Sequence, residues 1–390
     1  MRKNILALTL LSILTLSHCS KNEEVVIPQV SIFGTSKSRS TSSNVVMSFN
    51  ISLNKAVSQE VSVNYSTSPG TALADKDYIT KSGTLVIPAG TQTASLDITI
   101  TSGNERKDDQ TFDLIFDSPK NCTLENTKAV GKILNDSGVI FNIDNKGYTT
   151  PTEYPGYTLK WSDEFSGTAV NTSDWTFEKG NNNGWGNNEL ENYTDRSQNV
   201  FVSNGNLVIE ARQETLSGFN YTSTRMITKG KRSFTYGRID IRAKVPKGKG
   251  IWPALWMLGS NIDQKSWPAC GEIDIMELIG QEPNKVHGTI HYGTSAPSRN
   301  RTGSYVLNSG SFDQEFHVYS LIWDKDNLKI LVDDINYFSA KSSDISSPYP
   351  FDLPFFFIFN IAVGGNWPGS PDNTTVFPQR MVVDYVRVFQ

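Results

Sequence analysis

The chain of 390 residues exceeds the roughly 100–200 residues of a single domain, so we expect two folded units. Its 36 Lys and Arg residues against 40 Asp and Glu residues leave a net charge of −4, which excludes a protein held to nucleic acid mainly by excess positive charge. A hydrophobic content of 37% excludes global disorder, and 3 cysteines are too few for a disulfide scaffold.

The N-terminal segment has the pattern of an export signal. A basic start precedes an apolar run from Ile5 to Leu16, which is shorter than the ~20 residues of a membrane-spanning helix. Cys19 then resembles the lipid-acceptor cysteine of bacterial lipoproteins, although His18 departs from the small residue that this pattern prefers. We expect a signal peptide over residues 1–18 and a solvated tether over 19–24. The protein would be an outer-membrane or cell-surface lipoprotein, or otherwise secreted or periplasmic, and would touch the membrane only through its lipid.

Residues 25–137 are predicted to form an antiparallel β-sandwich. Apolar and polar residues alternate over 45–53, as in a half-buried strand, and turn-forming pairs such as Pro69-Gly70 separate similar runs. The segment contains no His and no Trp, and we predict a spacer or accessory module. Cys122 here, and Cys270 in the second half, are expected to be free and buried.

Several short motifs in this half resemble a Calx-beta domain. They are Asp77-Tyr78, Gly83-Thr84-Leu85, Ile87-Pro88-Ala89-Gly90 and Asn135-Asp136. In that family acidic loop residues can bind calcium, and the candidates here are Asp75, Asp77, Glu105, Asp108, Asp109 and Asp136. The alternative, which we favour, is that they are ordinary solvated turn acids. Residues 138–155, weighted in Pro, Thr and Gly, are predicted to be a linker.

Residues 156–390 are again strand-rich and contain all 8 tryptophans. The almost continuous apolar run from Phe355 to Val363 predicts a central strand buried on both faces. No amphipathic helix of useful length is apparent, so we expect a large sandwich of two stacked sheets, with Trp161 and Trp323 in its core.

One predicted strand carries three acids. Glu272 and Asp274 share a face, but Glu277 is five residues beyond Glu272, an odd offset that would turn it toward the core. An unpaired buried carboxylate there would cost several kcal/mol. We therefore predict a β-bulge at Ile275-Met276, which returns Glu277 to the side of the other two acids.

Such an acidic face is most often solvated surface, but tryptophans beside the acids favour a glycan cleft. Indole faces stack on the apolar faces of sugar rings. Trp252, Trp267 and Trp367 are the candidates, whereas Trp256 fits core and cleft equally well. Two carboxyl groups about 5–5.5 Å apart are what retaining glycoside hydrolysis requires. Because the three carboxyl groups are close together, repulsion between their negative charges can keep one of them protonated near neutral pH.

Taken in order, several motifs resemble glycoside hydrolase family 16, specifically its laminarinase-type endo-β-1,3-glucanases. They are the acid strand, Gly250-Ile251-Trp252-Pro253-Ala254-Leu255-Trp256, Asn187-Asn188-Glu189-Leu190-Glu191, Val286-His287-Gly288-Thr289-Ile290-His291 and Gly364-Gly365-Asn366-Trp367-Pro368-Gly369. The match runs from about Leu159 to Gln390. The resemblance implies an all-β architecture, in which the Calx-beta or immunoglobulin-like sandwich is followed by a β-jelly roll with an open cleft.

The resemblance also implies the roles of individual residues. Glu272 corresponds to the nucleophile, Asp274 to its assistant and Glu277 to the acid/base. The positions that match the family's cleft are Asn188, Arg225, Trp252, Trp256, His291 and Trp367, to which we add Trp267 because it adjoins the acids. For His291, a hydrogen-bonding role at the cleft floor is expected. No cofactor is expected for catalysis, but Glu164, the Gly205 carbonyl and Asp384 match a structural calcium site of the family.

The sequence thus predicts a monomeric, retaining endo-hydrolase of β-1,3-glucan. One alternative is the same chemistry on mixed-linkage glucan, agar, porphyran or carrageenan. A further alternative is a glucan-binding protein without activity, which the presence of both glutamates disfavours.

Overall fold

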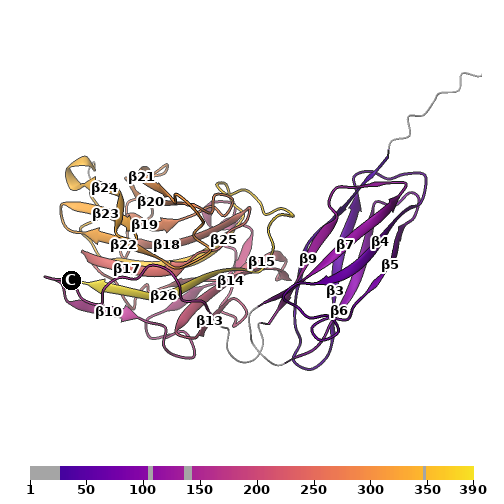
Figure 1. Ribbon diagram of the computed structural model, residues 1–390. Coiled ribbons are helices and arrows are strands. Elements are labelled where there is room, and N and C mark those ends of the chain that lie inside the picture. The colour runs from indigo at the N-terminus through magenta and orange to yellow at the C-terminus, as the bar shows by residue number, and fades with distance from the viewer. Residues whose placement is uncertain (1–26, 104–108, 136–142, 346–347) are drawn as a thin grey trace, which may run out of the picture.

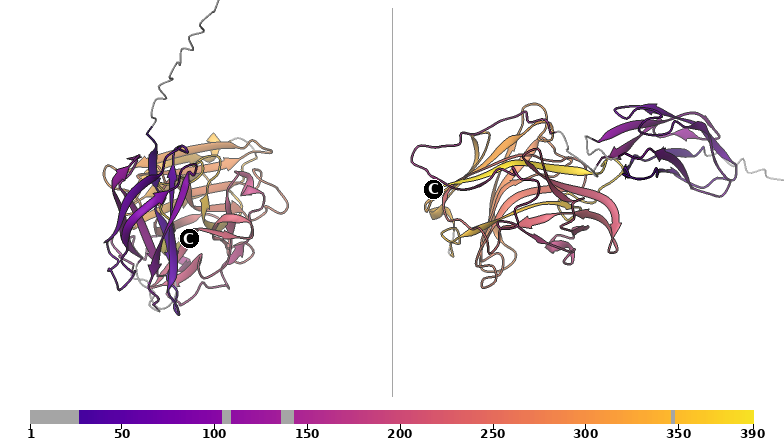
Figure 2. Two further views of the ribbon diagram at one scale, coloured as in Figure 1. Left: turned by 90° about the vertical axis from the view of Figure 1, so that its right-hand side faces the viewer. Right: turned by 90° about the horizontal axis from the view of Figure 1, so that it is seen from below.

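The computed structural model describes residues 27–103, 109–135, 143–345 and 348–390, arranged as two β-sandwiches that lie end to end (Figure 1). The two views in Figure 2 show the same arrangement from the side and from below. The predicted signal peptide and Cys19 lie outside the described residues. In the described part of the chain, the helices are two short 3-10 turns, Gly184–Gly186 and Ser342–Asp344, and neither is long and apolar enough to cross a membrane.

The N-terminal domain is the predicted sandwich. One sheet has the order β6-β3-β1-β8 and the other β2-β9-β7-β4-β5. The strands are β1 Gln29–Ile32, β2 Thr35–Ser38, β3 Val45–Leu53, β4 Val61–Pro69, β5 Ser82–Ile87, β6 Thr93–Ile100, β7 Gln110–Lys120, β8 Thr123–Leu124 and β9 Lys128–Leu134. The pairs β1–β8 and β2–β9 are parallel, which corrects the purely antiparallel prediction. The first two strands join different sheets, and each pairs with a strand from the end of the domain.

Two of the predicted turn acids are buried ion-pair partners, which corrects the expectation that they are solvated. Asp77 is 1% exposed and accepts a hydrogen bond from Arg39 at 2.7 Å. Asp109 is paired with Lys132 at 3.0 Å and with Arg380 of the second domain at 2.9 Å. The sequence patterns used above, apolar–polar alternation and turn-forming residues, cannot reveal these ion-pair partners, because the partners are distant in sequence. Asp75 does lie in an exposed turn, where it accepts hydrogen bonds from Thr80; Glu105, Asp108 and Asp136 lie outside the described residues.

The second domain stacks a ten-stranded sheet on a seven-stranded sheet. The larger has the order β12-β15-β14-β26-β17-β22-β23-β24, with β10 on β26 and β13 on β14; the smaller has the order β11-β16-β25-β18-β19-β20-β21. The strands are β10 Leu159–Asp163, β11 Thr176–Glu178, β12 Glu191–Tyr193, β13 Val200–Ser203, β14 Asn206–Leu216, β15 Phe219–Ser223, β16 Arg225–Ile227, β17 Gly237–Lys244, β18 Ile251–Gly259, β19 Glu272–Glu277, β20 Lys285–Tyr292, β21 Arg299–Val306, β22 His317–Trp323, β23 Asn327–Val332, β24 Ile335–Lys341, β25 Phe355–Val363 and β26 Gln379–Phe389.

The core between these sheets confirms the predicted packing. Every residue of β25 is buried, and the strand lies in the interior of its sheet between β16 and β18. Trp161 and Trp323 belong to the same hydrophobic core. Cys122 and Cys270 are both free and buried, as expected.

The C-terminal part of the predicted linker is packed onto the second domain. The backbone around Tyr148 pairs with Phe316, and Arg242 Nε donates to the Tyr148 carbonyl at 2.6 Å. Tyr154 donates its hydroxyl proton to Asp240 at 2.7 Å. Charged residues on the outer face of β17 are therefore buried under this segment. Asn145 and Thr150 add further hydrogen bonds, to Arg242 and to Tyr385, so the segment predicted as a linker from its Pro and Thr content is held to the sheet at several points.

Candidate active site

The predicted bulge is present in β19. Asp274 lies opposite Thr289 of β20, but Glu277 lies opposite His287, so three steps along β19 match two along β20. The register with β18 shifts at the same place. Ile273, Ile275 and Met276 are buried in the core. Glu277 consequently lines the same cleft as Glu272 and Asp274 instead of pointing into the interior.

The two glutamates receive hydrogen bonds from different tryptophans. Trp267 Nε1 donates to Glu272 Oε2 at 2.9 Å, and Trp252 Nε1 donates to Glu277 Oε1 at 3.0 Å. Each indole therefore orients one carboxyl group and also presents an aromatic ring beside it. These contacts place Trp267 at the Glu272 end of the acid strand and Trp252 at the Glu277 end.

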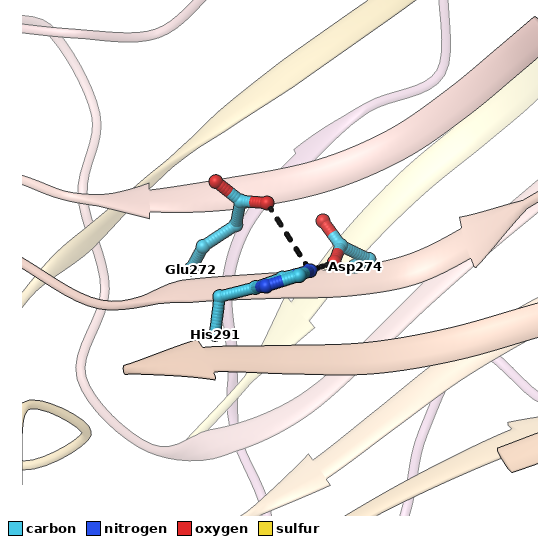
Figure 3. A group of neighbouring side chains, drawn as sticks. All are labelled: Glu272, Asp274 and His291. Atoms are coloured by element: carbon cyan, nitrogen blue, oxygen red, sulfur yellow. Dashed lines mark ion pairs between the residues drawn. The ribbon is translucent and has the colours of Figure 1, made fainter. Parts of the chain in front are cut away.

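His291 bridges two of the acids from the neighbouring strand (Figure 3). Its Nε2 lies 3.4 Å from Asp274 Oδ2 and 3.8 Å from Glu272 Oε1. Its Nδ1 is 3.0 Å from Ser298 Oγ, which fixes the orientation of the ring. One ligand atom from each of Glu272, Asp274 and His291 lies within 4.8 Å of the others. His291 therefore lines the cleft next to two of the acids, and its role in binding stays a prediction.

Burial raises the pKa of all three acids, and repulsion by a neighbouring carboxylate adds to the rise for Glu272 and Asp274. Desolvation is the main cause for each; the charge of Asp274 adds to the rise for Glu272, and the charge of Glu277 adds to it for Asp274. For Glu277, burial is opposed by the Trp252 hydrogen bond, which lowers the pKa. The group therefore retains protons at a higher pH than isolated carboxyl groups would, as an acid catalyst requires. The pKa directions alone do not separate nucleophile from acid, since all three are upward.

The acids form the floor of an open cleft of about 820 Å³. On one side, the Arg225 guanidinium lies 4.6 Å from the ring of Trp185 and 4.8 Å from that of Trp256, and it is paired with Glu178 at 2.5 Å. Trp256 Nε1 also donates to Asn360 at 2.8 Å. Trp256 thus belongs to the cleft as well as packing on a small apolar cluster.

Most of the predicted cleft residues meet in this one cleft. Arg225, Trp252, Trp256, Trp267, His291 and Trp367 all line it. Asn188 does not: its side chain donates to Asn366 at 2.8 Å, while the flanking Asn187 and Glu189 line the cleft in its place. Asn188 has a positive φ of 58°, which turns its side chain away from those of its neighbours.

Sequence reasoning missed several other lining residues. They are Trp185, Glu189, His287, Thr289, Asn300, Thr302 and Asn360. Trp185 is flanked by Gly184 and Gly186, a pattern that could have indicated a tryptophan on a loop, available to stack on a sugar. The threonines and asparagines carry no distinctive pattern, because their position depends on which strands become neighbours.

The two acids of the predicted calcium site are paired with arginines. Both oxygens of Glu164 accept hydrogen bonds from Arg387, at 2.8 and 2.7 Å, and Asp384 pairs with Arg242 at 2.7 Å. Of the described residues, the only cluster of three or more acidic, His or Cys ligands is Glu272, Asp274 and His291. A guanidinium group already neutralises each acid, so these contacts do not fit a cation at Glu164, Gly205 and Asp384. The calcium site stays a prediction that the geometry disfavours.

A two-sheet sandwich with an open aromatic cleft over clustered carboxyl groups is the architecture of a glycan-cleaving domain. Residues 187–387 match the family model of glycosyl hydrolases family 16, and residues 27–138 match that of the Calx-beta domain. The chain belongs to glycoside hydrolase family 16 and carries an N-terminal Calx-beta domain.

Curated relatives and solved structures agree with this assignment. A beta-glucanase of Rhodothermus marinus is 43% identical over 251 residues, which cover 60% of this chain and 86% of that protein. Glucan endo-1,3-beta-glucosidase A1 of Niallia circulans is 42% identical over 267 residues, which cover 62% of this chain but only 39% of that protein's length. The laminarinase catalytic domain of Thermotoga maritima MSB8 superimposes with a TM-score of 0.57 at 48% identity, covering 60% of this chain and 98% of that structure.

Proposed function

We propose that this protein is a retaining endo-hydrolase of β-1,3-glucan of the laminarin type. The observation that carries the proposal is the bulged strand β19, which places three acids on the floor of a tryptophan-lined cleft. The similarity to proteins named as glucanases and laminarinases supports the choice of substrate. An open cleft, rather than a closed pocket, suits attack at internal bonds of a long chain.

In the proposed reaction the ionised carboxylate of Glu272 attacks the anomeric carbon of the sugar. Glu277 gives its proton to the glycosidic oxygen, the bond between that carbon and the oxygen breaks, and a glycosyl ester with Glu272 forms. Glu277 then takes a proton from a water molecule, which attacks the same carbon and releases the sugar with its original configuration. Asp274 and His291 orient Glu272 and adjust the charge around it.

A reducing-end assay on laminarin tests the proposal. The wild type should release new reducing ends, and Glu272→Gln, which keeps the shape but cannot act as a nucleophile, should lose at least about 10³-fold in kcat. Mixed-linkage glucan and agarose run in parallel identify the substrate. A wild type that binds laminarin but releases nothing would favour a glucan-binding protein instead.

The cations of the cleft and of the segment that follows β16 favour a neutral glycan over a sulfated one, because each of them is already engaged by another group of the protein. Lys229 pairs with Asp263 at 2.6 Å, and Arg232 with Asp174 at 2.5 Å. Lys231 donates to the Trp175 carbonyl at 2.7 Å. Arg225 is the one cation among the described residues that line the cleft, and Glu178 neutralises it. Agarans or carrageenans with sulfate groups would find no free cation there.

We also propose that the protein is exported and anchored through a lipid on Cys19, on the evidence of the N-terminal sequence pattern alone. Metabolic labelling with palmitate should tag the wild type and not Cys19→Ala. Equal labelling of both proteins would overturn this part of the proposal.

A further inference from the structure

His287 is a cleft residue for which the proposed reaction supplies no role. It lies directly opposite Glu277 in the β19–β20 register, so both side chains are on the face of the sheet that lines the cleft. It lines the cleft together with Trp252 and Trp367.

The imidazole ring belongs to an aromatic group around the end of Glu277. Its centroid lies 5.1 Å from that of Trp367, in an edge-to-face arrangement, and Trp367 in turn meets Trp252 edge to face at 5.4 Å. Trp252 is the residue that donates to Glu277. Since an acid catalyst gives its proton to the departing oxygen, the sugar that leaves must lie on this side of the acid strand.

The Nε2 atom of His287 is buried without a hydrogen-bond partner among the described residues. Desolvation, reinforced by the charge of Lys285 and opposed by that of Glu282, lowers its pKa, so the ring is neutral near neutral pH. A neutral imidazole offers one donor and one acceptor nitrogen, and either suits a hydroxyl group. A phenylalanine would make the same ring contact with Trp367 without burying an unpaired nitrogen.

We propose that His287 binds the leaving-group sugar, that is, the sugar whose glycosidic oxygen receives the proton of Glu277. The Nε2 atom of His287 would form a hydrogen bond with a hydroxyl group of that sugar. This inference rests on the proposed function. Trp367, on the loop after β25, makes the edge-to-face contact with the His287 ring and is 39% exposed. For the hydrogen bond to form, this exposed indole must rotate enough for the nitrogen to reach a sugar in the cleft. The same indole then provides the stacking face for the bound sugar.

Two substrates separate this role from a structural one. Laminarin places a sugar on the leaving-group side, whereas β-laminaribiosyl fluoride has only fluoride there. The His287→Phe variant keeps the ring and loses the nitrogen. We expect its kcat/KM on laminarin to fall about 10-fold, the effect of one hydrogen bond, and its rate on the fluoride to stay within about 2-fold of wild type. The His287→Gln variant, which keeps a hydrogen-bonding group, should recover part of the loss.

The matched control is His317→Phe, a substitution of the same kind at a histidine outside the cleft, paired with Asp333 at 2.7 Å. It should leave the ratio of the two rates unchanged. Normal cleavage of laminarin by His287→Phe, or an equal loss on both substrates, overturns the role of His287 alone. A wild type inactive on both substrates overturns the proposed function, and this inference with it.

Discussion

At the scale of single residues, the site uses indole N–H groups to control carboxyl groups. Trp252 and Trp267 each donate to one glutamate, so an aromatic ring that can face a sugar also stabilises a charge. Arg225 likewise combines an aromatic contact with a charge contact. Its guanidinium lies beside the rings of Trp185 and Trp256 and is paired with Glu178. A second carboxyl pair, Glu189 and Glu191, is buried beside the cleft, and burial raises the pKa of both.

The Trp252–Glu277 hydrogen bond should be visible in the pH dependence of activity. Burial raises the pKa of Glu277, and the indole N–H, by stabilising the ionised form, opposes that rise. In Trp252→Phe the donor is lost, so the pKa of Glu277 should increase and its proton should be retained to higher pH. The basic limb of the kcat/KM profile on laminarin should therefore move to higher pH, even though overall activity falls. A limb that moves to lower pH would contradict the assignment of Glu277 as the acid.

At the scale of elements, strand β19 has one buried apolar face and one face that carries the three acids. The bulge is what keeps Glu277 on the acidic face. Ile275 and Met276 together occupy the place of one residue opposite β20, and both side chains are buried. The strand thereby accommodates one extra residue without turning Glu277 into the core.

Deletions in β19 test this account. Removing Met276 should restore regular pairing and keep Glu277 in the cleft, so laminarin cleavage should remain measurable. Stability should fall by about 2–5 kcal/mol through loss of a buried side chain, seen as a lower Tm by circular dichroism. Removing Ile273, which lies in the regular part of the strand, should turn Glu272 toward the core and abolish activity. Equal activity in the two deletion variants would argue against the bulge as the positioning device.

At the scale of the whole molecule, the two domains meet through buried charges. Arg380 of β26 donates a hydrogen bond to Asp109 of the N-terminal domain at 3.0 Å and makes a second ion-pair contact with it at 2.9 Å. Arg380 also pairs with Glu210 of β14 at 2.6 Å. Arg212 of the same strand reaches Ser38 at 2.5 Å. Although burial raises the pKa of Asp109, the charges of Arg380 and Lys132 hold it below its usual range.

Docking of the domains should depend on this cluster. Arg380→Met leaves Lys132 as the paired cation of Asp109 and removes the contact between the domains at this point, so it should loosen the N-terminal domain. The change should be seen as a larger maximum dimension in small-angle X-ray scattering. Because the folded pKa of Asp109 is depressed, its contribution is present above the unfolded pKa and is lost as pH falls through the folded value. Acid should therefore loosen the wild type as well. Lys128→Met, which removes a largely exposed pair with Asp113, is the control and should change neither result.

Local patterns were enough to predict the all-β fold, the core strand β25 and the three acids with their bulge. The alternation of apolar and polar residues along a strand shows which of its faces is buried. An acid that lies an odd number of residues from the other acids of its strand would point to the opposite, buried face, so it requires a bulge or an ion-pair partner. The cleft tryptophans Trp252, Trp267 and Trp367 were candidates through their sequence context beside the acids, and the family motifs added Arg225 and His291. These features depend on residues that are neighbours in sequence.

Only the tertiary structure decided which distant groups meet. The pairing of Asp109 with Arg380, the packing of residues 143–155 over β17, and the displacement of Asn188 from the cleft depend on partners far along the chain. His287 became a candidate for the same reason, because its register with Glu277 and its contact with Trp367 exist only once three strands and a loop have assembled. Sequence periodicity fixes the face on which a side chain lies, whereas its partners are set by how sheets and loops pack.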